Sequence, residues 1–404
     1  MGTIEKFNQH VMPTYGRLDI VLDKGHQQTA TAEDGKQYID FGSGIGTNSL
    51  GYCDSDWVDA ICAQARSIQH TSNYFYTKVQ ADFAAKLCET TGYSKVFFGN
   101  SGAEANECAI KLARKYSFDK YGKDAQRNII ITLVNSFHGR TLATLSATGQ
   151  DVFHNYFFPF LEGFVNVEAN NIDDLKAKLA ENEGKVCAVM FEFVQGEGGV
   201  CPLTKEFVDA IFEECAKSDI LTIADEVQTG VGRTGAVLTS ELFGVKPNIT
   251  TLAKGLAGGV PIGACLADES CCDVLTKSTH GSTFGGNPLA CAGGNVVLNK
   301  VSDPGFISEI NRKAELFKKL LLEIDEVQGV DGMGLMIGVR LKTKKAADVL
   351  AQCAEKGLLI LTAKDKLRFL PPLNISDENI INGMKIVKEI LDEKYGGKEN
   401  ETFA

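Results

Sequence analysis

Short apolar runs alternate with stretches of helical periodicity between residues 95 and 268. Apolar runs of about four to eight residues that are rich in β-branched side chains and end at glycine-containing turns are typical of buried strands in a parallel sheet. Helices between such strands cover the faces of the sheet, so this region predicts an α/β domain with a mostly parallel central sheet. The expected strands are 95–98, 129–134, 186–193, 221–224, 249–253 and 262–267.

The pattern differs on both sides of this region. Residues 1–55 predict an extended N-terminal arm and a small sheet. After residue 287 a long helical stretch passes through Asp303 and Pro304, and it is followed by expected strands at 333–341, 358–361 and 367–370. We therefore expect a large α/β domain over residues 56–295 and a smaller α+β domain over residues 296–404.

Composition narrows the classes of function. The chain has 404 residues, 44% of them hydrophobic and 23% charged, and a net charge of −11, which argues against nucleic acid or an anionic membrane as a partner. No apolar run reaches membrane-spanning length, the N-terminus lacks the order of a signal peptide, and the cysteines form no Cys-x-x-Cys pair. We expect a protein of the reducing cytoplasm that binds small anionic substrates through specific arginines.

Asp225 and Lys254 each end an expected strand, which places both at the carboxyl edge of the sheet, where ligands bind. A lysine that is partly removed from water can lose its proton and form an imine with an aldehyde. A nearby carboxylate can hold a protonated pyridine nitrogen and keep the ring electron-deficient. These are the requirements of pyridoxal 5'-phosphate chemistry, although either residue alone would be interpreted as an ordinary strand-end Asp or surface Lys.

The residues around this pair carry a specific resemblance. The motifs, in order, are Asp-Glu-Val-Gln-Thr-Gly at 225–230, Gly-Arg-Thr-Gly at 232–235, Ala-Lys-Gly at 253–255 and Pro-Ile-Gly at 261–263. They resemble the class III (ornithine-type) aminotransferases, and further motifs extend the resemblance over nearly the whole chain. The resemblance implies a fold-type I pyridoxal-phosphate transferase with the cofactor bound in the large domain. Lys254 would carry the cofactor, Asp225 would hold its ring nitrogen, and Gln228 would contact its phenolic oxygen.

A competing motif lies within the same segment. Residues 230–235 fit Gly-x-Gly-x-x-Gly, the fingerprint of dinucleotide-binding folds. Several residues separate this motif from the preceding strand, no periodic helix follows it directly, and no acidic residue stands near Gly255, where the ribose-binding acid should fall. We therefore do not expect a dinucleotide site.

Ser101 and Glu104 have the spacing of a capping box, at the start of a helical pattern that follows the strand expected at 95–98. Free amide groups at a helix N-terminus bind phosphate, and the small residues Gly102 and Ala103 allow a close approach. On its own the motif would mark only a helix start. The resemblance implies that Ser101, Gly102 and Ala103 cradle the cofactor phosphate.

Phe137, His138 and Arg140 follow the strand expected at 129–134. A Phe ring can stack on a planar ring and an Arg can bind a carboxylate through two parallel hydrogen bonds, although a core Phe and a surface Arg fit these residues equally well. The resemblance implies that Phe137 lies against the pyridine face and that Arg140 anchors a substrate carboxylate. His138 stands where ornithine δ-aminotransferases more often carry Trp. It favours the N-acetylornithine branch, and we expect it to form pocket wall.

Glu192 and Glu197 come close together around the end of the strand expected at 186–193. Two such carboxylates could serve a hydrolase or bind a divalent metal, but no histidine or third acid accompanies them, so we expect no metal site. The resemblance implies instead that Glu197 masks Arg368, which binds a substrate carboxylate when it is released. Phe193 stands where the family carries Pro.

The glycine-rich loop 280–288 contains the hydroxyl residues Ser282 and Thr283 and would by itself be only a turn. In the family this loop crosses a dimer interface. The resemblance therefore implies a homodimer in which Thr283 contacts the phosphate in the partner subunit's site, with Ser282 and Tyr15 at the substrate pocket. By residue type alone, Tyr15 would only pack the N-terminal arm.

The function that the resemblance implies is transfer of the δ-amino group of N2-acetylornithine to 2-oxoglutarate in arginine biosynthesis, giving N-acetylglutamate 5-semialdehyde and glutamate. Ornithine δ-transamination and the use of succinylornithine or lysine-pathway donors remain alternatives. An aminomutase of the same fold would need no second acceptor, and the Glu197 and Arg368 pair disfavours it. A non-catalytic cofactor-binding protein is disfavoured by Lys254, Asp225 and Arg140.

Overall fold

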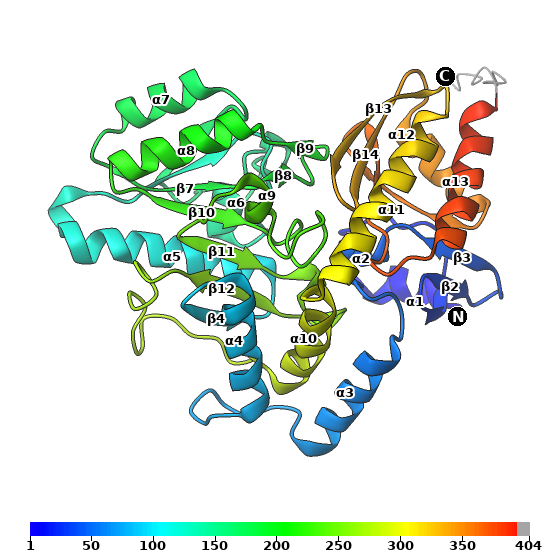
Figure 1. Ribbon diagram of the computed structural model, residues 1–404, viewed down its shortest axis with the longest axis horizontal. Coiled ribbons are helices and arrows are strands. Elements are labelled where there is room, and N and C mark those ends of the chain that lie inside the picture. The colour runs from blue at the N-terminus through cyan, green and yellow to red at the C-terminus, as the bar shows by residue number, and fades with distance from the viewer. Residues whose placement is uncertain (394–404) are drawn as a thin grey trace.

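A seven-stranded sheet is the largest sheet in the computed structural model, which describes residues 1–393 (Figure 1). The strands, in spatial order, are β4 (Lys95–Gly99), β12 (Gly263–Ala267), β11 (Ile249–Leu252), β10 (Leu221–Asp225), β7 (Val186–Phe191), β5 (Ile129–Leu133) and β6 (Phe164–Val167). The five strands from β11 to β6 are parallel, whereas β12 is antiparallel to both of its neighbours. The expected mostly parallel sheet is confirmed, and β6 is an additional strand.

Helices cover both faces of this sheet because its strands are apolar on both sides. Ala188 and Met190 of β7 pack with α5 (Gly102–Tyr121), whereas Val189 and Phe191 pack with α7 (Ile172–Glu181) and α8 (Lys205–Lys217). Successive side chains of a strand point to opposite faces, so a continuous apolar run requires cover on both. Figure 1 shows α5 on one side of the sheet and α7 and α8 on the other.

The expected strand 186–193 is shorter than predicted, because β7 ends at Phe191. The chain then turns and forms the hairpin of β8 (Val194–Gln195) and β9 (Cys201–Pro202). Glu192 stabilises this turn, since its carboxylate accepts hydrogen bonds from the backbone N–H groups of Phe137 at 3.0 Å and Gly196 at 3.2 Å. The turn carries Glu197 out beyond the sheet edge.

The C-terminal region forms a second, antiparallel sheet of β13 (Val327–Met333), β14 (Met336–Leu341), β17 (Lys366–Phe369) and β16 (Leu361–Ala363). The strand expected at 333–341 corresponds to β14, although it begins in the turn at Gly334, whose φ is +54°, and its antiparallel partner β13 is an additional strand. The helices of this region are α11 (Pro304–Leu322), α12 (Ala346–Glu355) and α13 (Asp377–Asp392). The long helical stretch before it ends with α10 (Pro288–Val301), and Asp303 caps the new helix α11 through the N–H of Gly305.

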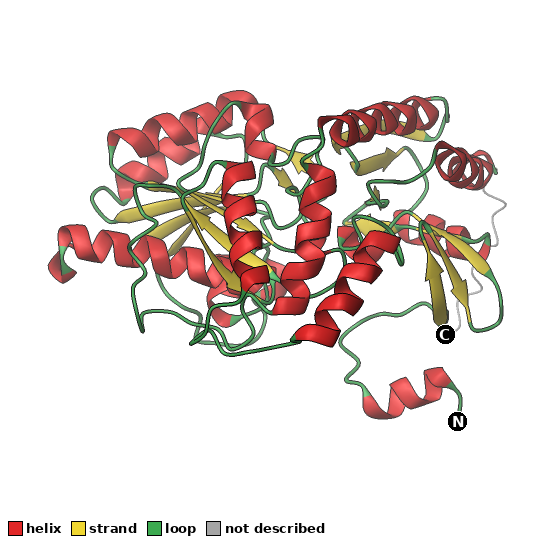
Figure 2. Ribbon diagram, turned by 60° about the horizontal axis from the view of Figure 1, so that its bottom comes forward, coloured by secondary structure: helices red, strands yellow, loops and turns green. Residues whose placement is uncertain are grey.

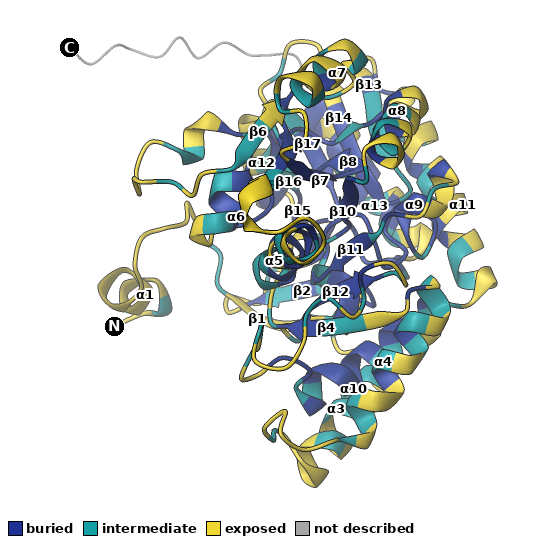
Figure 3. Ribbon diagram, turned by 90° about the vertical axis from the view of Figure 1, so that its left-hand side faces the viewer, coloured by how far each residue is buried: buried dark blue, intermediate teal, exposed yellow. Residues whose placement is uncertain are grey.

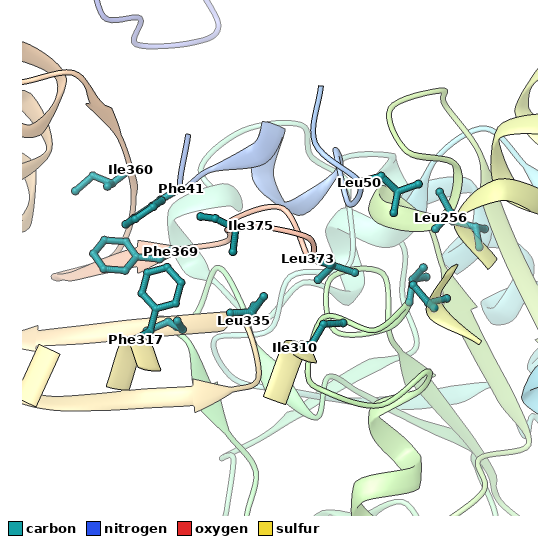
Figure 4. Close-up of a cluster of buried hydrophobic side chains, with 14 of the residues drawn as sticks. Phe41, Leu50, Leu256, Ile310, Phe317, Leu335, Ile360, Phe369, Leu373 and Ile375 are labelled. Atoms are coloured by element: carbon teal, nitrogen blue, oxygen red, sulfur yellow. The ribbon is translucent and has the colours of Figure 1, made fainter. Parts of the chain in front are cut away.

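The strand expected at 358–361 is divided between two sheets. Its first half, β15 (Leu358–Leu359), pairs in parallel with β3 (Gln37–Asp40), beside β2 (Thr29–Ala32) and β1 (Leu22–His26), whereas β16 belongs to the C-terminal sheet. The N-terminal strands thus share a sheet with a strand from residues 358–359. The rings of Phe41, Phe317 and Phe369 meet in the core beneath this junction, with Phe41 edge-to-face against the other two at 5.1 and 5.6 Å (Figure 4).

The N-terminal helix α1 (Thr3–His10) has no buried residue and projects from the rest of the chain (Figures 2 and 3), with a hydrogen bond from the hydroxyl of Thr3 to Oε2 of Glu33 at 3.3 Å. No helix within residues 1–393 is long and apolar enough to cross a membrane. The remaining helices are α2 (Ser43–Gly46), α3 (Ser55–Ser67), α4 (Lys78–Thr91), α6 (Leu142–Ala147), α9 (Thr239–Phe243), η1 (Lys123–Ala125), η2 (Asp151–Phe153) and η3 (Lys254–Ala257).

Candidate active site

A cavity of about 390 Å³ lies where β5, β7, β10 and β11 end, at the edge of the sheet at which ligands bind in open α/β folds. It brings together residues that are far apart in the sequence. The expected site residues that line it are Ser101, Gly102, Ala103, Phe137, His138, Arg140, Asp225, Gln228 and Lys254.

Asp225 is the last residue of β10, and three groups fix its buried carboxylate. Oδ2 lies 2.7 Å from Nδ1 of His138 and accepts a hydrogen bond from Nδ2 of Asn106 at 2.8 Å, while Oδ1 accepts the N–H of Val227 at 3.1 Å. Hydrogen bonds to a charged oxygen are stronger than those between neutral groups. The carboxylate is therefore held in one orientation before any ligand binds.

Asn106 is a site residue that the sequence analysis missed. Its Nδ2 also donates to the backbone O of His138 at 2.7 Å, and its Oδ1 accepts from the hydroxyl of Thr251 at 2.7 Å. It is fully buried on α5 beside Ala105 and Ala109. A polar side chain on the small, apolar face of a helix requires buried partners, and that was the available signal.

Lys254 follows β11 by one residue and starts the short helix η3 with a φ of +42°, a left-handed conformation that is costly for a residue with a side chain. Burial lowers the pKa of its ammonium, against the opposing charges of Asp225, Glu197 and Glu192. Within residues 1–393 its Nζ makes no hydrogen bond and no ion pair. The amine is thus more easily deprotonated than a surface lysine and is free to react with a carbonyl group.

The N-terminus of α5 forms a cradle for an anion. Oγ of Ser101 accepts the N–H of Glu104 at 3.2 Å, and in the described part of the chain the amides of Gly102 and Ala103 have no acceptor. A Cβ at Gly102 would lie 2.6 Å from Cγ1 of Val227, so only glycine fits there. Oε2 of Glu104 accepts hydrogen bonds from the backbone N–H of Asn100 at 2.6 Å and from its Nδ2 at 2.7 Å.

These groups together fit pyridoxal 5'-phosphate. The cavity offers free amides at a helix N-terminus for a phosphate, a buried carboxylate for a pyridine nitrogen and an amine for an aldehyde. Phe137 adds an aromatic ring to the wall. No group of three or more His, Cys, Asp or Glu residues in the described part of the chain could hold a metal ion.

Arg368 of β17, in the C-terminal sheet, pairs with Glu197, which lies in the hairpin of β8 and β9. Its Nη1 lies 2.6 Å from Oε1 of Glu197 and 3.4 Å from Oε1 of Gln228, which lines the cavity. Burial acts to raise the pKa of Glu197, but Arg368, with smaller effects from Lys254 and Gln228, outweighs it and lowers that pKa. The Arg368 side chain is 5% exposed, so its charge needs this partner.

Glu192 also lines the cavity, and sequence reasoning gave it no role. Burial raises its pKa to about 7; the charge of His138 lowers that pKa and the charge of Asp225 raises it further. Because its oxygens already accept the N–H groups of Phe137 and Gly196, Glu192 connects the loop of Phe137 to the hairpin of Glu197.

Five of the expected site residues do not line this cavity. Arg368, which pairs with Glu197, reaches its edge at Gln228, whereas Tyr15, Ser282 and Thr283 lie away from it. Tyr15 is 74% exposed on the N-terminal arm, and Thr283 is exposed. Ser282 accepts hydrogen bonds from Nδ2 of Asn100 and the N–H of Gly285, both at 3.1 Å. Ser282 and Thr283 instead line a second cavity of about 820 Å³, together with His70 and His280.

The geometry and the sequence define the same class of protein. The family model of the class-III aminotransferases matches residues 11–391, and the chain belongs to this family. The expected resemblance and fold are thereby confirmed.

Its similarity to individual members is strong. The chain is 49% identical to the acetylornithine aminotransferase of Haemophilus ducreyi, with 95% of this chain and 97% of that protein covered. It is 44% identical to the acetylornithine aminotransferase of Caldanaerobacter subterraneus, and the match covers 97% of this chain and 99% of that protein.

Solved structures show the same likeness. The ornithine aminotransferase from Toxoplasma gondii superposes with a TM-score of 0.91 at 31% identity and covers 96% of this chain and 94% of that one. The N-acetylornithine aminotransferase from Stenotrophomonas maltophilia gives a TM-score of 0.83 at 34% identity, and the superposition covers 96% of this chain and 98% of that one.

Proposed function

We propose that this protein transfers the δ-amino group of N2-acetylornithine to 2-oxoglutarate, giving N-acetylglutamate 5-semialdehyde and glutamate, in arginine biosynthesis and with pyridoxal 5'-phosphate as cofactor. The observation that carries the proposal is the pairing of Arg368 with Glu197 while Arg140 has no acidic partner in the described chain. A donor with one carboxylate can use Arg140 alone, and an acceptor with two carboxylates needs both arginines. The names of the two acetylornithine aminotransferases described above support the acetylated donor.

The chain's own residues would divide the work of binding the cofactor. Pyridoxal phosphate supplies an aldehyde that reacts with amines and a ring that withdraws electrons from the adjacent carbon. The amides of Gly102 and Ala103, with Ser101, would hold its phosphate. Asp225 would hold its ring nitrogen, with His138 and Asn106 orienting the carboxylate, while Phe137 and Gln228 would contact the ring and its phenolic oxygen.

Lys254 is the proposed base of the reaction. Its Nζ removes the proton from the carbon that bears the reacting amine and delivers a proton on the way to product. A base is most effective when its pKa lies near the working pH, and burial moves the pKa of Lys254 in that direction. The carboxylates of Asp225, Glu197 and Glu192 prevent a larger decrease.

The two arginines select the substrates. Arg140 holds the single carboxylate of acetylornithine, so that the δ-amine at the other end reaches the cofactor, and Glu197 meanwhile neutralises Arg368. 2-Oxoglutarate brings a second carboxylate, and Glu197 must release Arg368 to bind the one beside the keto group. One pocket thus accepts two substrates of different charge.

We also propose that the enzyme is a cytoplasmic homodimer. Tyr74 is 94% exposed and lines the second cavity with Thr283, and the neighbouring Phe284 is 57% exposed. Such exposed aromatic residues are typical of an interface. A second copy would cover them and could bring Thr283 to the partner's phosphate site. Light scattering of the purified holoenzyme should give twice the chain mass.

A panel of donors tests the activity. Purified protein with pyridoxal phosphate and 2-oxoglutarate is given acetylornithine, ornithine, succinylornithine, γ-aminobutyrate or lysine, and glutamate is measured. We expect the highest kcat/KM with acetylornithine. Ornithine is the second candidate, because the superposed enzyme from Toxoplasma gondii is an ornithine aminotransferase. A higher kcat/KM with ornithine than with acetylornithine would overturn the assignment.

A further inference from the structure

The guanidinium of Arg140 lies over the ring of Phe153. Its Cζ lies 3.8 Å from the centre of that ring, the shortest cation–ring distance within residues 1–393, and 5.4 Å from the centre of Phe137. Arg140 makes no hydrogen bond and no ion pair with any described residue. The aromatic ring is therefore the group that holds its charged end, and all of its N–H donors remain available.

Phe153 is fixed to the same loop that carries Arg140. It ends the short helix η2, which follows residues 148–150. Hydrogen bonds connect these residues to 136–138: the N–H of His138 donates to Oγ1 of Thr148 at 3.0 Å, the N–H of Gly149 to Oγ of Ser136 at 3.1 Å, and Nε2 of Gln150 to the backbone O of Ser136 at 3.1 Å. The ring and the arginine thus belong to one hydrogen-bonded unit.

Phe153 differs from the other large side chains of its segment. Val152 is 66% exposed, Tyr156 70%, Phe157 64% and Phe158 72%. Phe153 is half-buried and meets Phe137 edge-to-face at 5.9 Å. Of this group, only Phe153 contacts residues that line the cavity, namely Phe137 and Arg140.

We propose that Phe153 is a positioning residue that determines how tightly the enzyme binds a substrate carboxylate. The inference rests on the proposed function, in which Arg140 is the carboxylate anchor. A flexible arginine loses rotamer freedom when it binds a ligand, and a ring that already holds the guanidinium in place reduces that cost. An acidic residue would also hold Arg140, but it would compete with the substrate carboxylate for the same N–H groups. A ring orients the cation without occupying its donors.

The test compares Phe153→Leu, which removes the ring, with Phe153→Tyr, which keeps it, in the holoenzyme. Phe157→Leu is the matched control, because Phe157 is an exposed neighbour. Single-turnover kinetics give the Kd and the maximal rate for acetylornithine and for N-acetyl-1,4-diaminobutane, the same donor without the carboxylate. Phe153→Met replaces Phe153→Leu if the leucine variant does not fold.

We expect Phe153→Leu to raise the Kd for acetylornithine roughly three- to tenfold, with little change in the maximal rate. The Kd for N-acetyl-1,4-diaminobutane should be unchanged, since it has no carboxylate for Arg140 to hold. Phe153→Tyr and Phe157→Leu should behave like the wild type. An unchanged Kd for acetylornithine, or an equal rise for both donors, would overturn the proposal.

Arg140→Ala separates this inference from the proposed function. If Arg140→Ala raises the Kd for acetylornithine but Phe153→Leu does not, Arg140 is the anchor and the proposed role of Phe153 is wrong. If Arg140→Ala leaves the Kd for acetylornithine unchanged, the proposed role of Arg140 itself is wrong, and the inference about Phe153 is overturned with it.

Discussion

Nδ1 of His138 lies 2.7 Å from Oδ2 of Asp225, and both side chains are buried. A carboxylate only accepts hydrogen bonds, so Nδ1 carries the proton that the two atoms share. Nε2 of His138 has no partner within residues 1–393. His138, which the sequence predicted only as pocket wall, therefore acts on Asp225 and would influence the cofactor through it.

Replacing Asp225 should stop chemistry without preventing cofactor attachment. A carboxylate at about 4 Å from a positive charge contributes roughly 4 kcal/mol at an effective dielectric constant of about 20, which corresponds to about a thousandfold in rate. We expect Asp225→Ala to lower kcat by orders of magnitude while bound cofactor, measured after release in alkali, stays near one per chain. Near-normal turnover would contradict the role.

The hydrogen bond from His138 should have a smaller effect. A hydrogen bond to a charged group contributes about 1.5–3 kcal/mol, so His138→Phe should lower kcat about ten- to a hundredfold, less than Asp225→Ala. In the double variant the two losses should not add, because His138 acts through Asp225. Additive losses in kcat would mean that His138 acts independently.

Lys254→Ala should abolish covalent attachment of the cofactor and turnover together, because no other described lysine lines the cavity. The wild-type holoenzyme is reduced with borohydride, digested and mapped by mass spectrometry, with Lys111→Ala as a control outside the cavity. We expect the label on the peptide that contains residue 254 in the wild type and in the control. A label on any other lysine would show that the assignment is wrong.

Glu197→Gln should change the two half-reactions in opposite directions. The variant keeps the size of the side chain but leaves Arg368 without a negative partner, so Arg368 is permanently available to a carboxylate. The α-carboxylate of glutamate stands next to the reacting amine. The single-turnover rate with glutamate should therefore rise relative to the rate with acetylornithine. Single-turnover rates with each donor measure the ratio, and an equal response of both donors would eliminate the proposed switch.

Glu226 should make stability depend on pH. It is fully buried, and its carboxylate accepts the N–H groups of Thr239 and Ser240 at the start of α9; burial raises its pKa from 4.5 to about 7, against the lowering effect of these hydrogen bonds. The folded protein thus keeps a proton that the unfolded chain loses. The stabilisation is complete below pH 4.5 and is lost as pH rises to about 7.

The size of this effect follows from the pKa shift. Between pH 4.5 and about pH 7 the free energy of unfolding of the wild type should fall by about 3 kcal/mol relative to that of Glu226→Gln. Urea denaturation at pH 5 and pH 8 measures the difference, and Glu206→Gln, at an exposed position, serves as the control. A wild-type profile parallel to that of Glu226→Gln would contradict the prediction.

The sequence predicted which segments form strands better than it predicted which strands pair with one another. Apolar runs with β-branched residues identified β5, β10 and β11, because burial on both faces leaves a continuous pattern. The run at 358–361 looked like one strand, yet Leu358 and Leu361 lie in different sheets. Hydrophobicity records that a residue is buried but not which strand it pairs with.

The site was predictable where a motif joined chemistry to a strand end, as for Asp225 and Lys254. Asn106 and Phe153 were not predicted, because each acts through another side chain. The packing of α5 brings Asn106 to Asp225, which is distant in sequence, and the turn at η2 brings Phe153 back to Arg140. The roles of Tyr15 and Thr283 stay predictions, since a single chain leaves both away from the cavity.

The pairing of β3 with β15 has a consequence for how the protein is made. Ile39 lies beside Leu358, so the N-terminal strands cannot complete their sheet until most of the chain has been synthesised. Thr47, which lines the cavity, follows β3 closely and depends on that sheet for its position. During translation the seven-stranded sheet can form before β15 is available to pair with β3. Chaperone dependence of the nascent chain should be greatest in this interval, when residues 22–40 have left the ribosome and residue 358 has not.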